Sequence, residues 1–357
     1  MKKPFFSIVI PTYNRVNVLY FALKSYLQQD FADFEIIVSD NCSIDNTKEV
    51  TEKFNDKRIK YYKNPSNIGF ISNVMQGVLK AKGDYIITHG DDDVILYKDS
   101  LRKIHSLILK NGVGFVRLNC LSQSRTSSRI THVWIDKKKD WYLKPGADSL
   151  DIINFFDKVN LPFISGLVFK NENITIKDFA NSELSPWLGC VFKQVKKYGG
   201  YFLKKTFIVA SWSKGGIGGI YFVNKPNQLF FYAYLDYLSQ YILTKNEFEK
   251  YKSEYSETMK RASIFLLPTI KYFTNNENLI KYEAALSQFD KSITVNFTFK
   301  FFYYLSLMLP KSIVAIIRNN IHYVRRDTAL ILSDIASKDE INTIEKDYQK
   351  IMHEPLR

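Results

Sequence analysis

Short apolar runs alternate with helical patterns over the first part of the chain. Each run is bounded by turn residues and predicts a buried strand. The runs are Phe5–Ile10, Phe34–Val38, Ile59–Tyr62 and Asp84–Thr88. Between them, apolar residues three and four positions apart predict helices over 16–29, 45–54 and 70–81. Repeated strand–helix–strand units predict an α/β fold, with a mostly parallel sheet covered by helices on both faces.

The pattern changes twice further along the chain. Strand-like runs and one helical pattern mix at 114–118, 164–169, 207–210 and 186–197. From about residue 221 the signals are nearly all helical, and glycines become few. We therefore expect two domains, a sheet domain over 1–220 and a helical C-terminal region over 221–357.

Composition favours a folded cytoplasmic protein. Hydrophobic residues make up 46% of the chain, which excludes wholesale disorder. Cys42, Cys120 and Cys190 lack metal-ligand spacing, which indicates a reducing compartment and no structural zinc. The first apolar run is too short for a signal peptide. The uncharged stretch 301–310 falls far short of the roughly 20 apolar residues that a spanning helix needs.

Polar residues gather where the predicted strands end. Pro11–Arg15 follow the first strand, Ser39–Asp45 the second, and Gly90–Asp93 the fourth. In an open parallel sheet, ligands bind at the carboxyl ends of the strands, near the point where strand order reverses. An expected strand order of 3-2-1-4 brings Thr12, Asp40 and the three acids of the last segment around one crevice.

Asp91, Asp92 and Asp93 are consecutive. Like charges this close resist joint ionisation unless a cation neutralises them. Mg²⁺ or Mn²⁺ prefers such oxygen ligands, and Mg²⁺ keeps positions free for water and substrate phosphates. The cluster therefore predicts a divalent cation on a diphosphate rather than a solvated acidic turn.

These motifs, in this order and spacing, resemble the family 2 glycosyltransferases. They are Pro11-Thr-Tyr-Asn-Arg15, Ser39-Asp-Asn-Cys-Ser-Ile-Asp-Asn-Thr47, Asn67-Ile-Gly69 with Asn73, and Gly83-Asp-Tyr-Ile86 followed by Asp91–Asp93. The resemblance is strong over about 5–105 and weak to about 215. The Gly-Asp-Asp-Asp variant looks like the bacterial surface-polysaccharide branch, which includes abequosyltransferase-like members.

The resemblance implies a GT-A fold and a metal-dependent inverting transfer of sugar. The donor would be a nucleotide diphosphate-sugar, and the acceptor a saccharide on a lipid carrier. Asp40 would accept a hydrogen bond from the base, and Arg15 would reach the pyrophosphate. The implied donor-site residues are Pro11, Thr12, Tyr13, Arg15, Asp40, Asn67, Asn73, Asp91 and Asp92.

The resemblance also implies Asp92 and Asp93 as metal ligands, with Asp91 serving the ribose. The register stays open by one position, because the family often reads Asp-x-Asp-Asp and Gly90 stands at its first position. The direct ligand among the three acids is therefore left open.

The catalytic base departs from the family pattern. The family commonly uses a Glu-Asp pair that opens a helix after the metal motif. Here Ser185 and Pro186 stand at that place. Glu183 is the candidate base and Asp178 the alternative; each could instead be a surface cap.

Two further segments, one rich in glycine and one predicted helix, each allow two interpretations. The glycine-rich segment 211–219 is either a lid carrying Trp212 and Lys214 or an inter-domain linker. The helix predicted over 311–326 has an apolar stripe beside a basic one, and 291–326 holds no acid. This pattern predicts a helix lying on an anionic membrane, with packing on the first domain as the alternative.

Rival functions explain less of the sequence. A formal net charge of +14 would suit nucleic acid, but three acids in the main crevice repel its phosphates, so we expect no nucleic-acid partner. The glycine-rich turn of a Rossmann oxidoreductase and the P-loop are both missing from the sequence. A non-catalytic, glycosyltransferase-like binding module stays open because the base departs from the pattern.

Overall fold

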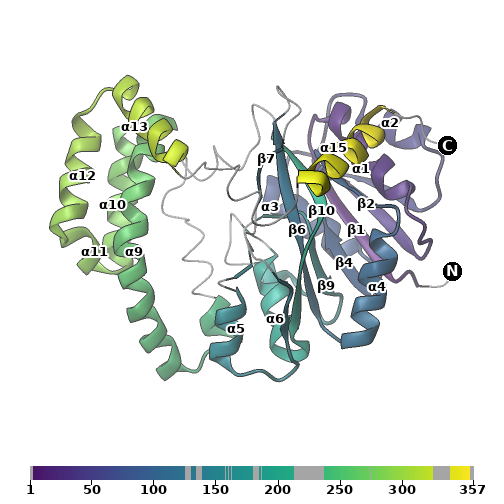
Figure 1. Cartoon of the computed structure of the whole chain (residues 1–357), viewed down its shortest axis with the longest axis horizontal. Helices are drawn as coiled ribbons and strands as arrows, with labels where there is room; N and C mark the ends of the chain where they lie inside the picture. Colours follow the sequence, from purple (N-terminus) through teal and green to yellow (C-terminus); the bar gives the residue numbers. More distant parts are fainter. Residues whose placement is uncertain are drawn as a thin grey trace. The chain divides into compact units, whose positions relative to one another are not determined.

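The computed structural model describes residues 3–124, 130–133, 139–156, 158–159, 161, 163–179, 185, 187–212, 237–273, 275–324 and 338–353. Its strands are β1 (Phe6–Thr12), β2 (Phe34–Asp40), β3 (Ile59–Lys63), β4 (Tyr85–Thr88), β5 (Asp93–Ile95), β6 (Phe115–Ser124), β7 (Ile130–Val133), β8 (Trp141–Leu143), β9 (Leu167–Lys170) and β10 (Gly200–Trp212). Its helices are α1 (Val16–Leu27), α2 (Thr47–Lys53), α3 (Phe70–Lys80), α4 (Ser100–Asn111), α5 (Ser149–Phe156), α6 (Leu188–Tyr198), α9 (Lys245–Phe273), α10 (Asn276–Phe289), α11 (Lys291–Val295), α12 (Phe297–Met308), α13 (Lys311–Val324) and α15 (Lys338–His353), with a 3-10 helix η1 (Ile176–Phe179). Figure 1 shows these elements along the chain.

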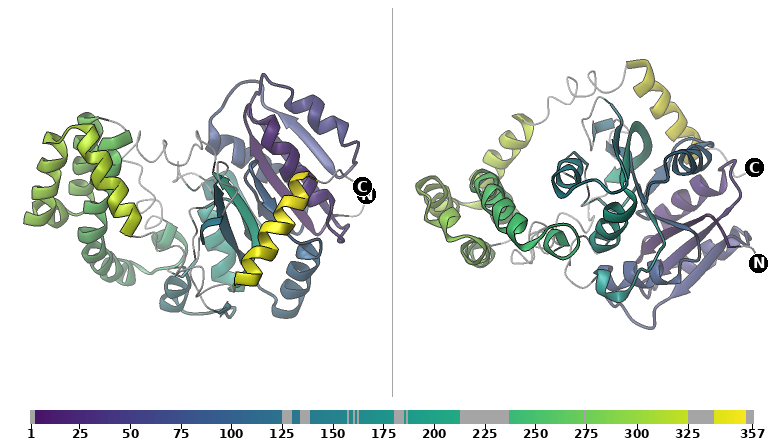
Figure 2. Two further views of the ribbon diagram at one scale, coloured as in Figure 1. Left: turned by 45° about the horizontal axis from the view of Figure 1, so that its top comes forward. Right: turned by 90° about the horizontal axis from the view of Figure 1, so that it is seen from below.

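The sheet has the predicted order at its parallel side. Its strands run β3-β2-β1-β4-β9-β6-β10-β5, with β7 beside β6 and β8 beside β10. The first four are parallel to one another. β9 runs antiparallel to both of its neighbours, and β5 closes the edge antiparallel to β10. The sheet is therefore mixed and mostly parallel, with helices on both faces, as predicted (Figure 2).

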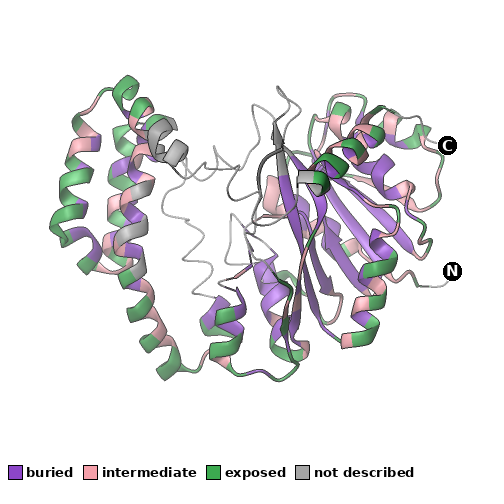
Figure 3. Cartoon of the chain, viewed as in Figure 1, coloured by how far each residue is buried: buried purple, intermediate pink, exposed green. Residues whose placement is uncertain are grey.

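The central strands are buried on both faces. Every residue of β1 and β2 is buried, which explains why their sequences lack the alternation of a half-exposed strand (Figure 3). α3 approaches the sheet closely at Gly77, where an added Cβ would lie 2.6 Å from Cγ1 of Val9. This close approach holds α3, and the loop before it, against the carboxyl ends of β1 and β2.

The chain forms two compact units, with divisions near residues 213 and 329. The first unit holds the sheet, the helices α1 to α6 and also α15; the second holds α9 to α13. The sequence boundary near 220 assigned all of 221–357 to the helical region, so the structure differs at α15. The apolar side chains of Ile344, Tyr348 and Ile351 explain the difference, because they pack on Val94, Leu96, Leu121 and Val209 of the first unit.

A buried lysine anchors α15. Lys24 of α1 is 2% exposed, and its Nζ donates to the backbone oxygen of Ile351 at 2.5 Å. The acceptor lies in the last turn of α15, where carbonyl groups lack helical partners and a cation is favourable. α1 and α15 thus lie side by side in both views of Figure 2.

The second unit is a helical bundle. α10, α12 and α13 all pack on the long helix α9. Its core includes Leu267, Tyr282, Leu286, Ile293 and Phe299. Within the described ranges, no helix is long and apolar enough to cross a membrane.

Candidate functional site

The carboxyl ends of three strands bring the predicted crevice residues together. Thr12 at the end of β1 pairs in register with Asp40 at the end of β2. The Thr12 hydroxyl donates to Asp91 Oδ2 at 2.8 Å, across the β1–β4 side of the crevice. Both Thr12 and Asp91 are largely buried. Their contact fixes the acidic segment after β4 against the end of β1.

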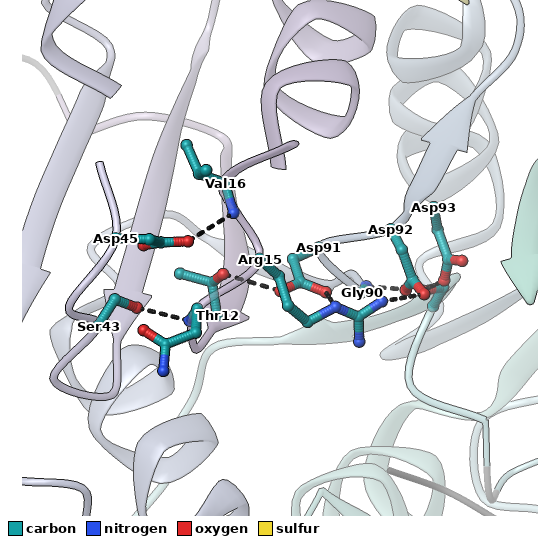
Figure 4. A network of polar contacts seen from close by, with 11 residues as sticks. Thr12, Arg15, Val16, Ser43, Asp45, Gly90, Asp91, Asp92 and Asp93 are labelled. Atoms are coloured by element: carbon teal, nitrogen blue, oxygen red, sulfur yellow. Dashed lines mark hydrogen bonds and ion pairs between the residues drawn. The ribbon is translucent and has the colours of Figure 1, made fainter. Parts of the chain in front are cut away.

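The loops after β1 and β2 are joined by side chains. The backbone amide of Asn14 donates to Ser43 Oγ at 2.9 Å, and the backbone amide of Ile44 donates to the side-chain oxygen Oδ1 of Asn14 at 2.8 Å. Asn14 adopts φ 53°, a left-handed conformation that asparagine tolerates better than most residues. Asp45 accepts from the Val16 amide at 3.1 Å and so caps α1 (Figure 4). The crevice wall is therefore held by hydrogen bonds that two separate motifs supply.

Asp40 is fully buried. Its Oδ1 accepts from the amide of Ser43 at 2.9 Å and from the Ser43 hydroxyl at 2.5 Å. Its Oδ2 accepts from the Tyr61 hydroxyl at 2.5 Å. Burial raises the pKa of Tyr61 well above its usual value, and the bond to Asp40 adds to that effect. These contacts give Asp40 a structural part in the loop; its bond to a nucleotide base stays a prediction.

Side-chain hydrogen bonds hold Asn67 and Asn73 against the residues that follow β2 and β3. Asn41 donates to Asn67 Oδ1 at 2.7 Å, and Asn64 donates to Asn73 Oδ1 at 2.9 Å. The Asn73 side-chain amide also donates to the backbone oxygen of Ser39 at 2.8 Å. Asn73 is 2% exposed. The two residues predicted for the donor site therefore fix the loop before α3 and tie α3 to the end of β2.

Arg15 lies between two of the three acids. Its Nη2 donates to Asp92 Oδ2, and its Nε lies 3.5 Å from Asp91 Oδ1 (Figure 4). Burial lowers the pKa of Arg15, but the carboxylates of Asp91 and Asp92 outweigh burial, and the net pKa lies above its usual value. Arg15 therefore supplies positive charge to Asp91 and Asp92, while the predicted metal stays a prediction.

Asp93 faces a different partner. Its carboxylate accepts from the Ser165 hydroxyl, and Ser165 Oγ in turn accepts from the Gly90 amide at 2.7 Å. Asp93 is 3% exposed. A Cβ added at Gly90 would lie 2.8 Å from Asp93 Oδ2, so this position requires glycine for Asp93 to adopt its observed place. At the position where the family often has the first Asp of Asp-x-Asp-Asp, this chain has Gly90, because a larger residue would collide with the Asp93 carboxylate.

A buried arginine supports Ser165. Arg117 of β6 is fully buried, and its Nη1 donates to the backbone oxygen of Ser165 at 2.5 Å. Its Nε and Nη2 have no hydrogen-bond partner in the part of the chain that the structure describes. Burial lowers the pKa of Arg117. Sequence reasoning missed Ser165 and Arg117, because both stand in ordinary strand-like runs without a motif.

The two candidate bases differ in what the structure says of them. Asp178 is 2% exposed; its Oδ2 accepts from the Thr175 amide at 2.7 Å and lies 3.2 Å from Lys193 Nζ. These contacts cap η1 and tie it to α6, so Asp178 has a structural role, and its part as a base stays a prediction. Glu183 lies outside the described residues.

The predicted lid also falls mostly outside the described residues. Trp212 ends β10, but only its backbone is described. Lys214 lies beyond the described range. Tyr13, predicted for the base and ribose pocket, is described and is 38% exposed, whereas Pro11 is buried within β1.

The acids fit a metal that a diphosphate helps to hold. Among the residues described, no three His, Cys, Asp or Glu side chains gather as a metal site. Mg²⁺ on a diphosphate, however, needs only one or two protein carboxylates. The Asp92 side chain is 17% exposed and its oxygen donors suit Mg²⁺ or Mn²⁺. Arg15 contacts the same Asp92 carboxylate, so a bound metal ion and the Arg15 guanidinium would both contact Asp92.

Comparison with known proteins identifies the family of the sheet domain. The model of "Glycosyl transferase family 2" matches residues 7–166. A Campylobacter jejuni GalNAc(5)-diNAcBac-PP-undecaprenol beta-1,3-glucosyltransferase is 37% identical over 123 residues, which cover 33% of this chain and 38% of that protein. The Escherichia coli beta-1,3-glucosyltransferase WfgD, named for UDP-Glc and alpha-D-GlcNAc-diphosphoundecaprenol, is 32% identical over 110 residues, or 31% of this chain and 43% of that protein. The chain thus matches less than half the length of these two relatives.

Solved structures share the fold over nearly the whole chain. A crystal structure of S. aureus TarS 1–349 in complex with UDP-GlcNAc superposes with a TM-score of 0.60 and 18% identity, covering 97% of this chain and 91% of that one. The mannosyltransferase PcManGT from Pyrobaculum calidifontis, in complex with GDP-Man and Mn²⁺, has a TM-score of 0.50, 14% identity, and coverage of 89% and 87%. At these identities the likeness concerns the fold alone, and it confirms the predicted GT-A architecture.

Proposed function

Residues 7–166 form a glycosyl transferase family 2 domain, and from that premise we propose that the chain transfers a sugar from a nucleotide diphosphate-sugar to a saccharide acceptor on a lipid carrier. The acceptor class is supported by the names of two relatives, which specify acceptors on undecaprenyl diphosphate. The reaction belongs to bacterial surface-polysaccharide synthesis. It takes place in the cytoplasm, at the inner face of the plasma membrane.

One observation carries the proposal: Arg15 lies between Asp91 and Asp92 where β1 and β4 end. A guanidinium bound to carboxylates can exchange them for phosphate oxygens, which it also binds in a bidentate manner. Arg15 therefore joins the ends of β1 and β4 and would contact the diphosphate of the donor. Asp91 would serve the ribose, while Asp92 and Asp93 would hold Mg²⁺ or Mn²⁺.

The protein's own groups have distinct parts in this reaction. A bound divalent cation supplies positive charge that stabilises the nucleoside diphosphate as it leaves. A carboxylate takes the proton of the acceptor hydroxyl while the hydroxyl oxygen attacks the anomeric carbon from the opposite side. We assign this base to Glu183 before Asp178, because the Asp178 carboxylate already accepts from Thr175 and is paired with Lys193. Inversion at the anomeric carbon follows from a single displacement.

The test is a donor screen followed by turnover. Thermal shifts with nucleoside diphosphates, each with and without Mn²⁺, would identify the nucleotide. Sugar transfer to an undecaprenyl-diphosphate saccharide is then measured with the matching nucleotide-sugars, in wild type and Glu183→Gln. Nucleotide binding without transfer to any acceptor would favour the non-catalytic binding module instead. Absence of a nucleotide-dependent shift would contradict both.

A further inference from the structure

One face of α12 is apolar and exposed. Phe297, Phe301, Tyr304 and Met308 are 82%, 55%, 57% and 82% exposed, respectively. Their spacing of four, three and four residues places them in one line along the helix. The opposite face, with Phe299, Tyr303 and Ser306, packs into the core of the second unit. We call the four exposed residues the α12 stripe.

The α12 stripe is unlike the other exposed apolar side chains. Single exposed residues such as Leu109 of α4 and Ile280 of α10 are normal on a protein surface. Three large aromatic rings and a methionine in one line expose a continuous apolar strip. Such strips mark places where a soluble protein contacts a partner or a membrane.

The charges that lie close to the α12 stripe in sequence favour an anionic surface. Residues 291–326 hold six basic side chains and no acidic one. Lys300 is exposed on α12 itself, and Lys291 and Lys311 are exposed before and after the helix. A second copy of this chain, seated on the stripe by a two-fold axis, would face lysine with lysine, since such an interface repeats the same patch. Anionic lipid headgroups would instead neutralise them.

The side-chain types fit the same surface. Phenylalanine and methionine can enter the acyl boundary of a bilayer, and tyrosine favours the headgroup level because one end of it is polar. α12 has 12 residues, which at about 1.5 Å each gives a helix far shorter than a bilayer. It could lie in the interface plane but could not span the membrane.

We propose that the α12 stripe, with its flanking lysines, is a docking surface for anionic lipid bilayers. This deepens the proposed function, because a transferase that uses a lipid-linked acceptor must reach it at a membrane. The sequence had pointed to the following helix, α13. In α13, Ile313 and Ile316 of that predicted apolar stripe are exposed as well. The α12 stripe therefore adds a second exposed apolar surface to the one predicted on α13.

The experiment is vesicle co-sedimentation of the full chain. Wild type is compared with the triple variant Phe297→Gln/Phe301→Gln/Met308→Gln, at low and moderate salt. Vesicles contain phosphatidylethanolamine with phosphatidylglycerol, or phosphatidylcholine alone as the neutral surface. The matched control is Leu109→Gln/Leu150→Gln/Ile280→Gln, which replaces three exposed apolar residues elsewhere. All six positions are exposed, so thermal unfolding should stay close to wild type in both variants.

We expect the triple variant to lose at least tenfold in partition to anionic vesicles, while the control binds as wild type does. Lys300→Gln should weaken binding roughly fivefold, the loss expected for one charge near an anionic surface. Binding of wild type to neutral vesicles should be much weaker. Equal binding by the triple variant and the control would overturn the proposal.

Two further measurements separate this inference from its alternatives. Sedimentation velocity reports the oligomeric state: a wild-type dimer that the triple variant converts to monomer would assign the α12 stripe to a second copy and overturn the lipid assignment. Transfer to a water-soluble acceptor should be equal in wild type and triple variant. Vesicle binding requires no catalysis. A protein that fails to transfer sugar could therefore still bind vesicles, and a protein that fails to bind vesicles could still transfer sugar to a soluble acceptor.

Discussion

The hydroxyl of Tyr61 donates a 2.5 Å hydrogen bond to the carboxylate of Asp40, which has no exposed surface. With the two bonds from Ser43, this contact satisfies much of the carboxylate from within the protein. Asp40 therefore joins β2, β3 and the loop after β2, besides its predicted contact with the nucleotide base. Mutations can separate the structural role of Asp40 from its predicted role in nucleotide binding.

Tyr61→Phe should lower the free energy of unfolding by about 1.5–3 kcal/mol, the value of a hydrogen bond to a charged group. Nucleotide affinity should change little, because Tyr61 reaches the site only through Asp40. Asp40→Ala should lower both quantities, since it leaves three donors without their acceptor. Chemical denaturation and calorimetry on the two variants provide the comparison. Full stability in Asp40→Ala would show that the internal bonds contribute nothing.

Arg15→Ala should raise the affinity for Mn²⁺ measured without nucleotide. Removing the guanidinium leaves Asp91 and Asp92 close together and uncompensated, and a cation then relieves their repulsion. Nucleotide diphosphate should bind more weakly, by roughly 1–3 kcal/mol for the lost charged contact. Calorimetric titrations with Mn²⁺ and with nucleotide measure the two effects. Arg102→Ala, which breaks only the exposed pair with Asp30, is the control and should change neither.

Gly90→Ala should lower turnover at least tenfold while the protein stays folded. The added Cβ would meet Asp93 Oδ2 at 2.8 Å, so the Asp93 side chain must move from Ser165. Such a shift costs about 1–3 kcal/mol by the general experience with overpacked sites. Steady-state kinetics and circular dichroism are the measurements. Undiminished turnover would mean that the observed position of Asp93 has no part in catalysis.

Arg117→Met should affect turnover more than stability. The buried guanidinium makes one bond to the Ser165 carbonyl, and its cost of burial offsets what that bond contributes. We expect the free energy of unfolding to change by less than about 1 kcal/mol, with a kcat lowered through the displaced Ser165 and Asp93. Arg117→Lys, which can still donate to the carbonyl, should recover part of the kcat. Lost stability with unchanged kcat would assign Arg117 to the core alone.

The parallel half of the fold was predictable because its signals are local. β1 and β2 are short apolar runs, α3 has clear helical spacing, and strand order 3-2-1-4 follows from the crossover rules. A strand over 164–169 was predicted, but the antiparallel direction of β9 was not. The edge strand β5 was not predicted, since it is three residues long and begins inside the acidic motif at Asp93. Its pairing partner, β10, lies more than a hundred residues away in sequence.

The proximity of the strand ends was predictable, but the contacts between their side chains were not. The expected strand order brought Thr12, Asp40 and the three acids to one edge of the sheet, where Thr12 contacts Asp91. Nothing local could show that Asp93 faces Ser165 while Asp92 faces Arg15, because Ser165 arrives from the loop before β9. The buried state of Asp40 likewise depends on Tyr61 of the neighbouring strand.

The return of α15 to α1 makes the second unit an insertion rather than an appendage. α15, the last helix that the structure describes, completes the sheet unit through Lys24 and the apolar patch around Val94 and Val209. Cutting the chain before α15 would therefore uncover that patch and destabilise the sheet unit, which carries the proposed donor site. A cassette exchange, which replaces the second unit and keeps both flanking segments in frame, would instead preserve the sheet unit.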